Sequence, residues 1–333
     1  MTRNSFVKTG KPFVKTGKPL VILTGPTAVG KTGLSLKLAR RIGGEIISAD
    51  SMQVYRHMDI GSAKIRPEEM QGIPHHMIDI LEPWEEFNVV IFQKRCLECL
   101  EKIYHAGHIP ILTGGTGFYI QAVLYGIDFT ENGENTACRQ ALEEIAKEED
   151  GALKLHRMLR EADPASAEVI HANNVRRVIR ALEFYRLTGQ KISEHNQAQR
   201  ARTSAYNSAY FVLDDDREKL YRRIEERVDQ MMEQGLVSEV TALRDMGCQP
   251  GLVSMQGLGY KEIMAHLAGE TSLERAVELI KQNTRHFAKR QLTWFRREKE
   301  VIWVEKPDFA YDEDRILDYM IQILSERHLT NAP

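Results

Sequence analysis

Short apolar runs alternate with amphipathic stretches along the first part of the chain. Residues 20–23 (LVIL) form an unbroken apolar run closed by a glycine turn, which is typical of a strand buried on both faces of a parallel sheet. Leu34, Leu38 and Ile42 then recur at helical spacing, so we expect a helix over 33–41. Further strand candidates follow at 45–49, 78–81 and 108–113. Strands that alternate with helices predict an α/β fold with a parallel sheet covered by helices on both faces.

The middle of the chain has a different character. Over residues 130–202 strand signals are absent and the composition is helical and highly charged, so we expect an inserted all-helical domain. The run 210–213 returns to the sheet, with Asp214 or Asp215 as the cap of the next helix. A repeat of FVKTGKP near the N-terminus has no role that we can assign. The expected divisions are a flexible leader (1–18), a core (19–129 and 203–310), a helical insertion (130–202) and a C-terminal helix (311–333).

Composition excludes several classes of protein. With 333 residues the chain is long enough for about two domains. It has no apolar stretch of the roughly 20 residues that a bilayer span requires. Lys and Arg number 45 against 47 Asp and Glu, so any nucleic-acid site must be a local basic patch. The N-terminus lacks the apolar core of a secretory signal, and we expect a cytoplasmic monomer that does not contact membranes.

A glycine-rich motif joins the first expected strand to the first expected helix. GPTAVGKT matches the pattern G-x-x-x-x-G-K-[ST] in the strand-to-helix context that phosphate binding requires. Lys31 can neutralise a terminal phosphate and Thr32 can be a ligand of Mg²⁺. The residues expected to bind a diphosphate or triphosphate are Gly25, Pro26, Thr27, Ala28, Val29, Gly30, Lys31 and Thr32. The expected fold is therefore P-loop NTPase-like.

The residues that follow two other expected strands indicate which reactions the phosphate loop could serve. The strand that ends at Thr113 runs into residues 114–116 (GGT) and lacks the carboxylates with which an ATPase motor holds Mg²⁺ and activates water. Asp50 follows the second expected strand, at the edge of the sheet where ligands collect in such folds. Its position leaves two interpretations equally open, a general base or the N-cap of the following turn. The amide of Gln53 can pair with the edge of a nucleobase.

Two basic stripes are candidates for a polyanion site. Lys281, Arg285 and Lys289 fall at i, i+4 and i+8 of an expected helix. Apolar positions on its opposite flank repeat every seven residues, at Ile280, Phe287 and Trp294. A second stripe lies in the helical insertion, at Arg176, Arg177 and Arg180. Two such stripes in a nearly neutral protein favour a polyanion groove over ordinary solvated faces.

Five motifs occur in a characteristic order along the chain. They are GPTAVGKT at 25–32, SADSMQVYRHMDIGSAK at 48–64, GGTGFY at 114–119, LYRRIEERVDQM at 220–231 and AKRQLTWFR at 288–296. Together they resemble the motifs of the tRNA dimethylallyltransferase family, over nearly everything from Pro19 to Val304. The resemblance implies transfer of a dimethylallyl group from dimethylallyl diphosphate to N6 of the adenosine immediately 3′ of the anticodon in certain tRNAs. The phosphate loop then holds the departing diphosphate rather than ATP.

The resemblance also implies roles for individual residues. Asp50 accepts the N6 proton, Thr116 makes a hydrogen bond at the reacting end of the diphosphate, and Arg227 stabilises the charge that grows there. Mg²⁺ is the implied cofactor, with Thr32 as its ligand, and the anticodon stem-loop of tRNA is the implied partner. A flipped target base is expected, which residues 255–261 help to hold. The residues assigned to tRNA binding, from the resemblance and the stripes, are Asp50, Ser51, Met52, Gln53, Arg176, Arg177, Val178, Ile179, Arg180, Lys281, Arg285 and Lys289.

Two other functions remain open at this point. A small-molecule kinase built on the same phosphate loop would use ATP to phosphorylate a nucleoside or a metabolite. A protein that binds RNA without catalysis would have lost the function of that loop, although Gly30, Lys31, Thr32 and Asp50 are all present. Phosphate transfer from ATP without tRNA would identify the kinase. Prenyl transfer to tRNA would exclude the RNA-binding module.

Overall fold

The computed structural model of the protein describes residues 17–129, 137–200 and 202–330. The chain divides into two compact units, with boundaries between Gly126 and Ile127 and between Thr203 and Ser204. We call residues 127–203 the helical unit, and the described residues on either side of it the core unit. The expected leader lies outside the described residues except for Gly17 and Lys18. None of the helices in these ranges combines the length and the apolarity that a membrane span needs.

Six parallel strands of the described chain form the sheet of the core unit, in the order β3-β2-β4-β1-β5-β6. Their bounds are β1 Pro19–Thr24, β2 Gly44–Ser48, β3 His75–His76, β4 Ile109–Gly114, β5 Asn207–Asp214 and β6 Val301–Glu305. Strands β1 and β2 are buried along almost their whole length, which explains the continuous apolar run of β1. The expected parallel α/β sheet is confirmed, with β1 between β4 and β5.

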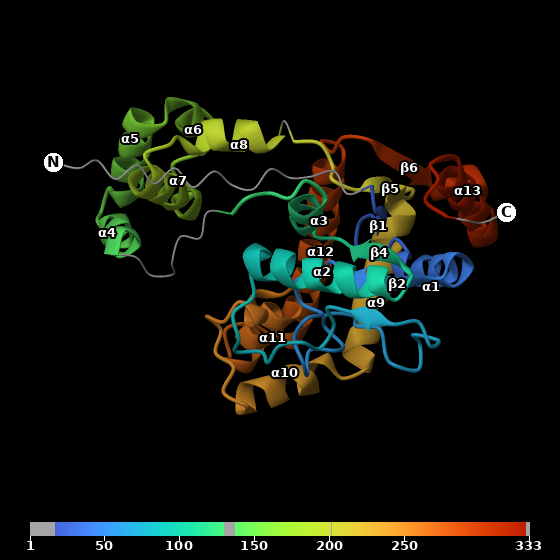
Figure 1. Cartoon of the computed structure of the whole chain (residues 1–333). Helices are drawn as coiled ribbons and strands as arrows, with labels where there is room; N and C mark the ends of the chain where they lie inside the picture. Colours follow the sequence, from blue (N-terminus) through green and yellow to red (C-terminus); the bar gives the residue numbers. More distant parts are fainter. Residues whose placement is uncertain (1–16, 130–136, 201, 331–333) are drawn as a thin grey trace. The chain divides into compact units, whose positions relative to one another are not determined.

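Helices cover both faces of this sheet. Those of the core unit are α1 Lys31–Ile42, α2 Val89–His105, α3 Gly117–Leu124, α9 Arg217–Glu233, α10 Leu236–Asp245, α11 Tyr260–Leu267, α12 Leu273–Phe295 and α13 Glu313–Glu326, with 3₁₀ turns η1 Ser254–Gln256 and η2 Lys306–Phe309. α2 and α3 pack on the face that carries Ile22 and Leu112, whereas α1 and α13 pack on the face of Val21 and Ile111. Figure 1 shows α2 lying along the sheet beside β4 and β2.

The third expected strand is wrong in position. Residues 78–81 do not form a strand, because Met77 and Asp79 have positive φ values of 66° and 53° that interrupt an extended chain. β3 lies just before them and pairs with β2. Leu81 makes only an isolated bridge to Tyr55.

Two features around β5 and β6 also differ from expectation. Asp216, rather than Asp214 or Asp215, caps α9 by accepting the backbone N–H groups of Glu218 and Lys219. β6 is not among the expected strands, because it is short and directly follows a run of charged residues. Of its five residues, only Val304 is fully buried. It completes the sheet beside β5.

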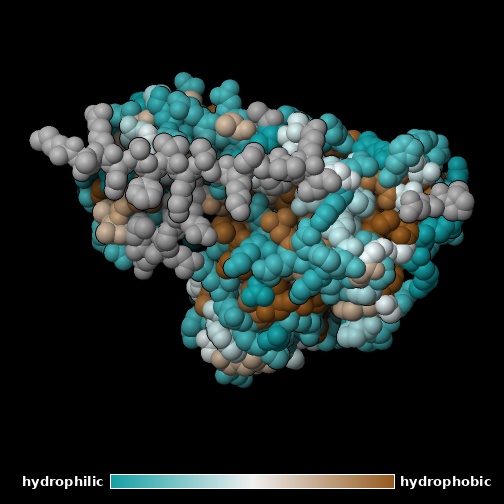
Figure 2. All heavy atoms as spheres, viewed as in Figure 1, coloured by the Kyte–Doolittle hydropathy of each residue, from teal (hydrophilic) through white to brown (hydrophobic). Residues whose placement is uncertain are grey.

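The helical unit has a core of its own. Its helices are α4 Ala137–Ala146, α5 Gly151–Ala162, α6 Pro164–Val169, α7 Val175–Thr188 and α8 Ile192–Arg200. Leu142, Leu155, Leu159 and Leu182 are buried among these helices, and the described residues of the unit include no strand. On the face in Figure 2, the part of this unit that is not grey has a mainly hydrophilic surface.

Candidate active site

The phosphate loop, residues 25–32, connects the end of β1 to the first residues of α1. Gly25 has a φ of 147° and Gly30 a φ of 98°, values that residues with a side chain rarely adopt. A Cβ on Gly25 would also lie 2.4 Å from the carbonyl oxygen of Leu213 on β5. The glycines thus permit the tight turn between a buried strand and a helix N-terminus, the arrangement in which backbone N–H groups bind phosphate.

Lys31 lies over this loop from the first position of α1. Its Nζ donates hydrogen bonds to the carbonyl oxygens of Gly25, at 3.0 Å, and Pro26, at 2.8 Å. Burial, and after it the Arg227 guanidinium, lower the pKa of Lys31 from 10.5 to about 7, while Asp50 acts in the opposite direction. An anion bound in the loop would favour the charged form of this lysine.

A cavity of about 460 Å³ lies beside the loop and brings the main predicted groups together. Its lining includes Lys31 and Thr32 of α1, Asp50 after β2, and Arg223 and Arg227 of α9. Of the remaining loop residues, the lining contains Thr27, Ala28 and Gly30 but not Gly25, Pro26 or Val29. The volume is within the usual range of small-molecule sites. The phosphate loop and the candidate base therefore face one cavity.

Asp50 is the cap that its sequence position allows and it also lines the cavity, whereas its role as a base stays a prediction. Its Oδ1 accepts the backbone N–H groups of Met52, at 2.8 Å, and Gln53, at 3.3 Å, so the carboxylate caps the turn after β2. Its Oδ2 has no hydrogen-bond partner among the described residues, and the side chain lines the cavity. The cap orients the carboxylate and leaves one oxygen available to a ligand. Ser51 and Met52, also predicted to contact tRNA, are half-buried outside the cavity lining.

Gln53 lines the cavity, but protein groups already occupy its amide. The Ser48 hydroxyl donates to Gln53 Oε1 at 2.9 Å, and Gln53 Nε2 lies 3.4 Å from the carbonyl oxygens of Ser62 and Ala63. Pairing of this amide with a nucleobase would require these bonds to break. In this structure Gln53 holds residues 62–63 against β2, and these two residues form part of the cavity wall.

The same wall is anchored from α10. Glu239 accepts hydrogen bonds from the backbone N–H groups of Asp59, Ile60 and Gly61, at 2.9, 2.7 and 3.1 Å, and from the Tyr260 hydroxyl at 2.8 Å. The Tyr260 ring lies so close that a Cβ on Gly61 would be 2.6 Å from it. This anchor joins residues about 180 positions apart in the chain, so no local sequence signal indicates it.

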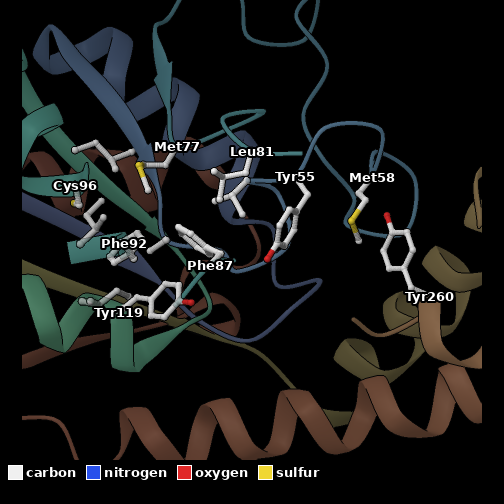
Figure 3. Packing of buried hydrophobic residues seen from close by; sticks show 14 of the residues in the cluster. Tyr55, Met58, Met77, Leu81, Phe87, Phe92, Cys96, Tyr119 and Tyr260 are labelled. Atoms are coloured by element: carbon white, nitrogen blue, oxygen red, sulfur yellow. The ribbon is translucent and has the colours of Figure 1, made fainter. Parts of the chain in front are cut away.

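Aromatic packing supports the segment that follows Asp50. Tyr55 and Tyr119 make edge-on contacts with Phe87, at ring-centroid distances of 6.4 and 5.8 Å, and Figure 3 shows Phe87 between them. In the same view Met58 lies beside the Tyr260 ring. Tyr260 belongs to the 255–261 segment that we expect to hold the target base. Its side chain is buried, so the described role of this residue is to support the wall.

Two arginines of α9 bring positive charge to the cavity. Arg227, predicted from the sequence, is half-buried and has no hydrogen-bond partner in the described part of the chain. Burial lowers its pKa, which Asp50 partly counteracts. Arg223 is not among the predicted site residues, although its position one turn before Arg227 indicated the same helix face. It forms an ion pair with the buried Asp215. With Lys31, these arginines give the cavity three basic side chains.

Thr116 lies next to the cavity rather than in its lining. It occupies the N-cap position of α3, and its backbone N–H bonds to the carbonyl oxygen of Ala49 at 3.3 Å. Gly114 and Gly115, just before it, do line the cavity. Its contact with a diphosphate stays a prediction. Gln291 of α12 also lines the cavity and is absent from the predicted site residues.

The basic stripe of α12 is partly neutralised by α9. Lys281 Nζ lies 2.6 Å from the carboxylate of Asp229, and Arg285 pairs with Glu225. Lys289 is exposed. Because two of the three cations already have carboxylate partners, they are weaker candidates for phosphate contacts than Lys289.

The packing face of α12 differs from the expected one. Its buried residues are Ala276, Ile280, Ala288, Gln291 and Phe295. Phe287 and Trp294 are only half-buried. Phe287 lines the cavity, and Trp294 contacts Phe118 edge-on at 6.1 Å. Residues seven positions apart are rotated by about 20° around the axis of a straight helix, so a seven-residue repeat does not stay on one face.

The second basic stripe lies on α7 of the helical unit. Arg176, Arg177 and Arg180 are exposed and have no ion-pair partner among the described residues. Val178 and Ile179, predicted with them, are buried in the core of this unit. Contact with tRNA through these two apolar side chains is therefore excluded in this conformation, and the arginines alone remain as candidates.

The cavity contains oxygen ligands that suit a divalent metal bound together with a phosphate. Thr32 is exposed in it, and within the described ranges its hydroxyl has no hydrogen-bond partner. Asp50 and Glu226 contribute carboxylates to the same lining. Mg²⁺ prefers such ligands and keeps the rest of its coordination for phosphates and waters. No group of three His, Cys, Asp or Glu side chains in the described chain could hold a metal by itself. The residues fit a metal shared with the ligand.

The fold and this cavity define an enzyme of the P-loop class, with a carboxylate and the glycine-rich loop lining the same cavity. Comparison with known families gives a more specific assignment. Residues 53–298 match the family described as IPP transferase, and residues 18–81 match the family described as isopentenyl transferase. The chain belongs to the IPP transferase family, in agreement with the resemblance of its motifs.

Individual relatives match over nearly the whole chain. The tRNA dimethylallyltransferase of Lachnoclostridium phytofermentans is 60% identical over 309 residues, which cover 93% of this chain and 98% of the relative. That of Carboxydothermus hydrogenoformans is 50% identical over 285 residues, 86% of this chain and 91% of the relative.

Solved structures agree with these relatives. The full-length tRNA isopentenylpyrophosphate transferase of Bacillus halodurans is 43% identical with a TM-score of 0.70, over 93% of this chain and 98% of that chain. A eukaryotic dimethylallyltransferase acting on tRNA has a TM-score of 0.80 at 30% identity, over 93% of this chain and 80% of that chain.

Proposed function

We propose that the protein transfers a dimethylallyl group from dimethylallyl diphosphate to N6 of the adenosine immediately 3′ of the anticodon (nucleotide 37) in tRNA, releasing diphosphate in the cytoplasm. One observation carries the proposal: Lys31 of the phosphate loop and the Asp50 carboxylate line a single cavity of about 460 Å³. A prenyl diphosphate and a nucleobase amine can meet there. Relatives described as tRNA dimethylallyltransferases support the choice of acceptor.

At the donor end, the bond between the allylic carbon and the diphosphate oxygen breaks. Negative charge grows on that oxygen, and stabilising it lowers the barrier. Lys31, Arg223 and Arg227 are placed to do this because all three line the cavity. We assign Thr116 a hydrogen bond to the reacting end of the diphosphate, which requires its hydroxyl to approach the cavity from the neighbouring loop.

At the acceptor end, the exocyclic amine of adenine is a poor nucleophile because its lone pair is delocalised into the ring. Asp50 Oδ2 accepts the N6 proton as the new carbon–nitrogen bond forms. Such proton removal typically contributes on the order of 10² to 10⁴ in rate. A paired or stacked base could not reach a half-buried carboxylate, so the target base leaves its stack to enter the cavity.

Mg²⁺ is the metal that we assign to this site. Thr32 would hold it from the protein side, together with diphosphate oxygens, and Asp50 or Glu226 lie within the same lining. When bound, it neutralises charge on the diphosphate. The assignment rests on the unpartnered Thr32 hydroxyl, judged within the described residues, and on the oxygen character of its neighbours.

For tRNA binding we assign the exposed cations Arg176, Arg177, Arg180 and Lys289. Contacts to RNA phosphates position the substrate, whereas contacts to the target base specify it. Lys281 and Arg285 contribute less because their charges are already paired with α9.

The test is incubation of the purified protein with dimethylallyl diphosphate, Mg²⁺ and unmodified tRNA, followed by mass analysis of the nucleosides. The expected product is adenosine that carries one dimethylallyl group, at the nucleotide 3′ of the anticodon. Unmodified tRNA after prolonged incubation would contradict the proposal. A parallel reaction with ATP and no prenyl donor tests the kinase alternative, which the family assignment does not favour.

A further inference from the structure

Gln291 of α12 joins two loops that are far apart in the sequence. Its side-chain Oε1 accepts the backbone N–H of Thr27 at 2.9 Å, and its Nε2 donates to the carbonyl oxygen of Gly115 at 3.0 Å. The residue is 6% exposed, although it also contributes to the cavity lining. Both functional ends of the amide are thus used on protein backbone.

The two loops belong to opposite ends of the proposed reaction. Thr27 is part of the phosphate loop, which holds the donor diphosphate. Gly115 precedes Thr116, whose N–H bonds to the carbonyl oxygen of Ala49, the residue before Asp50. A short series of hydrogen bonds and peptide units therefore leads from the phosphate loop, through the Gln291 amide, to the candidate base.

We propose that Gln291 is a positioning residue, which sets the distance between the bound diphosphate and the Asp50 carboxylate. This role rests on the proposed prenyl transfer. The Gln291 amide has an acceptor atom and a donor atom side by side, as the Thr27 N–H and the Gly115 carbonyl require. A glutamate would retain the acceptor but lose the donor, and a methionine of similar length would lose both.

The surrounding packing fits this role. A Cβ on Gly115 would lie 2.1 Å from Gln291 Nε2, so glycine is needed there for the amide to reach the backbone. Further along α12, Trp294 packs so tightly on Gly117 that a Cβ there would lie 2.3 Å from its ring. α12 therefore fixes the loop of residues 114–117 at two points.

Loss of the bridge should affect turnover more than binding. The groups assigned to hold the diphosphate, Lys31, Arg223 and Arg227, do not depend on Gln291 for a described hydrogen bond. Misplacement of reacting groups by about 1 Å can lower a rate by about 10²-fold. We therefore expect a reduced kcat with nearly unchanged KM for the prenyl donor and for tRNA.

The experiment compares Gln291→Met, Gln291→Glu and Gly115→Ala with the matched control Gln93→Met. Gln93 also bridges two elements, because its Nε2 donates to the carbonyl oxygen of Ala122 at 2.6 Å, but it is not part of the cavity lining. Steady-state kinetics with dimethylallyl diphosphate and tRNA, thermal unfolding and binding of inorganic diphosphate are measured for each. Gly115→Ala retains Gln291 and displaces its amide, so it tests the bridge even if a Gln291 variant folds poorly.

The expected result is a kcat lowered about 10- to 100-fold in Gln291→Met and Gly115→Ala, with both KM values and diphosphate affinity within about 3-fold of wild type. Gln93→Met should keep its kcat. A wild-type kcat in the folded variants, or a loss confined to donor KM, would overturn the positioning role. If wild type and Gln93→Met also fail to modify tRNA, the proposed function itself is overturned. The control thus separates failure of the positioning role from failure of the proposed function.

Discussion

Lys31 is the residue at which the chemistry of the site depends most directly on pH. Its side chain lies over the phosphate loop, and burial is the main reason that its pKa falls to about 7. Without an anion, a large fraction of this lysine is therefore neutral near neutral pH. A bound diphosphate favours the protonated form, because an opposite charge nearby raises the pKa of a lysine.

We predict that binding of inorganic diphosphate weakens as the pH rises above about 7, since the free protein then loses a proton that the complex retains. Calorimetric titrations between about pH 6 and about pH 9 measure this for wild type and Lys31→Met. Ionisation of diphosphate itself is common to both proteins, so the difference between them isolates Lys31. The control is Lys37→Met, which removes a lysine of the same helix that does not line the cavity. Parallel pH profiles for wild type and Lys31→Met would contradict the prediction.

At the scale of elements, the cavity wall depends on contacts between segments that are distant in the chain. α10 holds residues 59–61 through Glu239, and Gln53 holds residues 62–63 against β2. One carboxylate thus satisfies three backbone N–H groups and one hydroxyl. Hydrogen bonds to a charged acceptor are stronger than neutral ones, so Glu239 should determine how rigid this wall is.

We predict that Glu239→Gln destabilises the protein by about 1 to 3 kcal/mol, because an amide cannot accept all of these hydrogen bonds. Hydrogen exchange measured by mass spectrometry should become faster at residues 58–63, while exchange in β1 and β4 stays slow. The control is Glu233→Gln, at an exposed position of α9. Unchanged exchange at residues 58–63 in a variant of normal stability would show that the anchor is unimportant.

At the scale of the whole molecule, the charge is nearly balanced, yet each unit presents cations that are candidates for RNA contact. The helical unit carries Arg176, Arg177 and Arg180 on α7, whereas in the core unit Lys281 and Arg285 are already paired with α9. Unpaired exposed cations release counterions when they bind phosphates, and paired ones release fewer. The α7 arginines should therefore contribute more to the salt dependence of tRNA binding.

Replacing Arg176, Arg177 and Arg180 by alanine should weaken tRNA binding and reduce the steepness of its salt dependence. The log–log slope should fall by about 0.7 to 0.9 for each RNA phosphate that the variant no longer neutralises. Diphosphate affinity should stay the same, because the cavity lies wholly in the core unit. Filter binding at several salt concentrations measures the slope. The control variant replaces Lys37, Arg40 and Arg41 by alanine, which removes the same number of positive charges from α1. Equal effects of the two triple substitutions would mean that only net charge matters.

Sequence alone predicted the features that depend on neighbouring residues. The strand, glycine turn and helix around Lys31 were confirmed because an apolar run, two glycines and a helical pattern lie within about twenty positions. The placement of Asp50 at the end of β2 followed from the same strand pattern. Both features could be predicted because the hydrophobic periodicity of neighbouring residues determines them.

The remaining parts of the site depend on long-range contacts. Gln291 lies 264 positions from Thr27, and Glu239 lies 180 positions from Asp59, whose backbone N–H it accepts. Glutamine and glutamate at exposed-looking helix positions carry no local signal of such contacts. Likewise, the burial of Val178 and Ile179 depends on how α7 packs against its neighbours, which a charge pattern does not determine.

In the proposed reaction, Asp50 acts as the base beside a diphosphate held by the phosphate loop. The most direct test of this role is the single-turnover rate of prenyl transfer by Asp50→Asn at saturating dimethylallyl diphosphate, Mg²⁺ and tRNA. Asparagine can still accept the N–H groups of Met52 and Gln53 but cannot take a proton at neutral pH. We predict a rate lowered by at least about 10², with diphosphate and tRNA affinities within about 3-fold of wild type. A transfer rate close to that of wild type would contradict the role of Asp50 as the base.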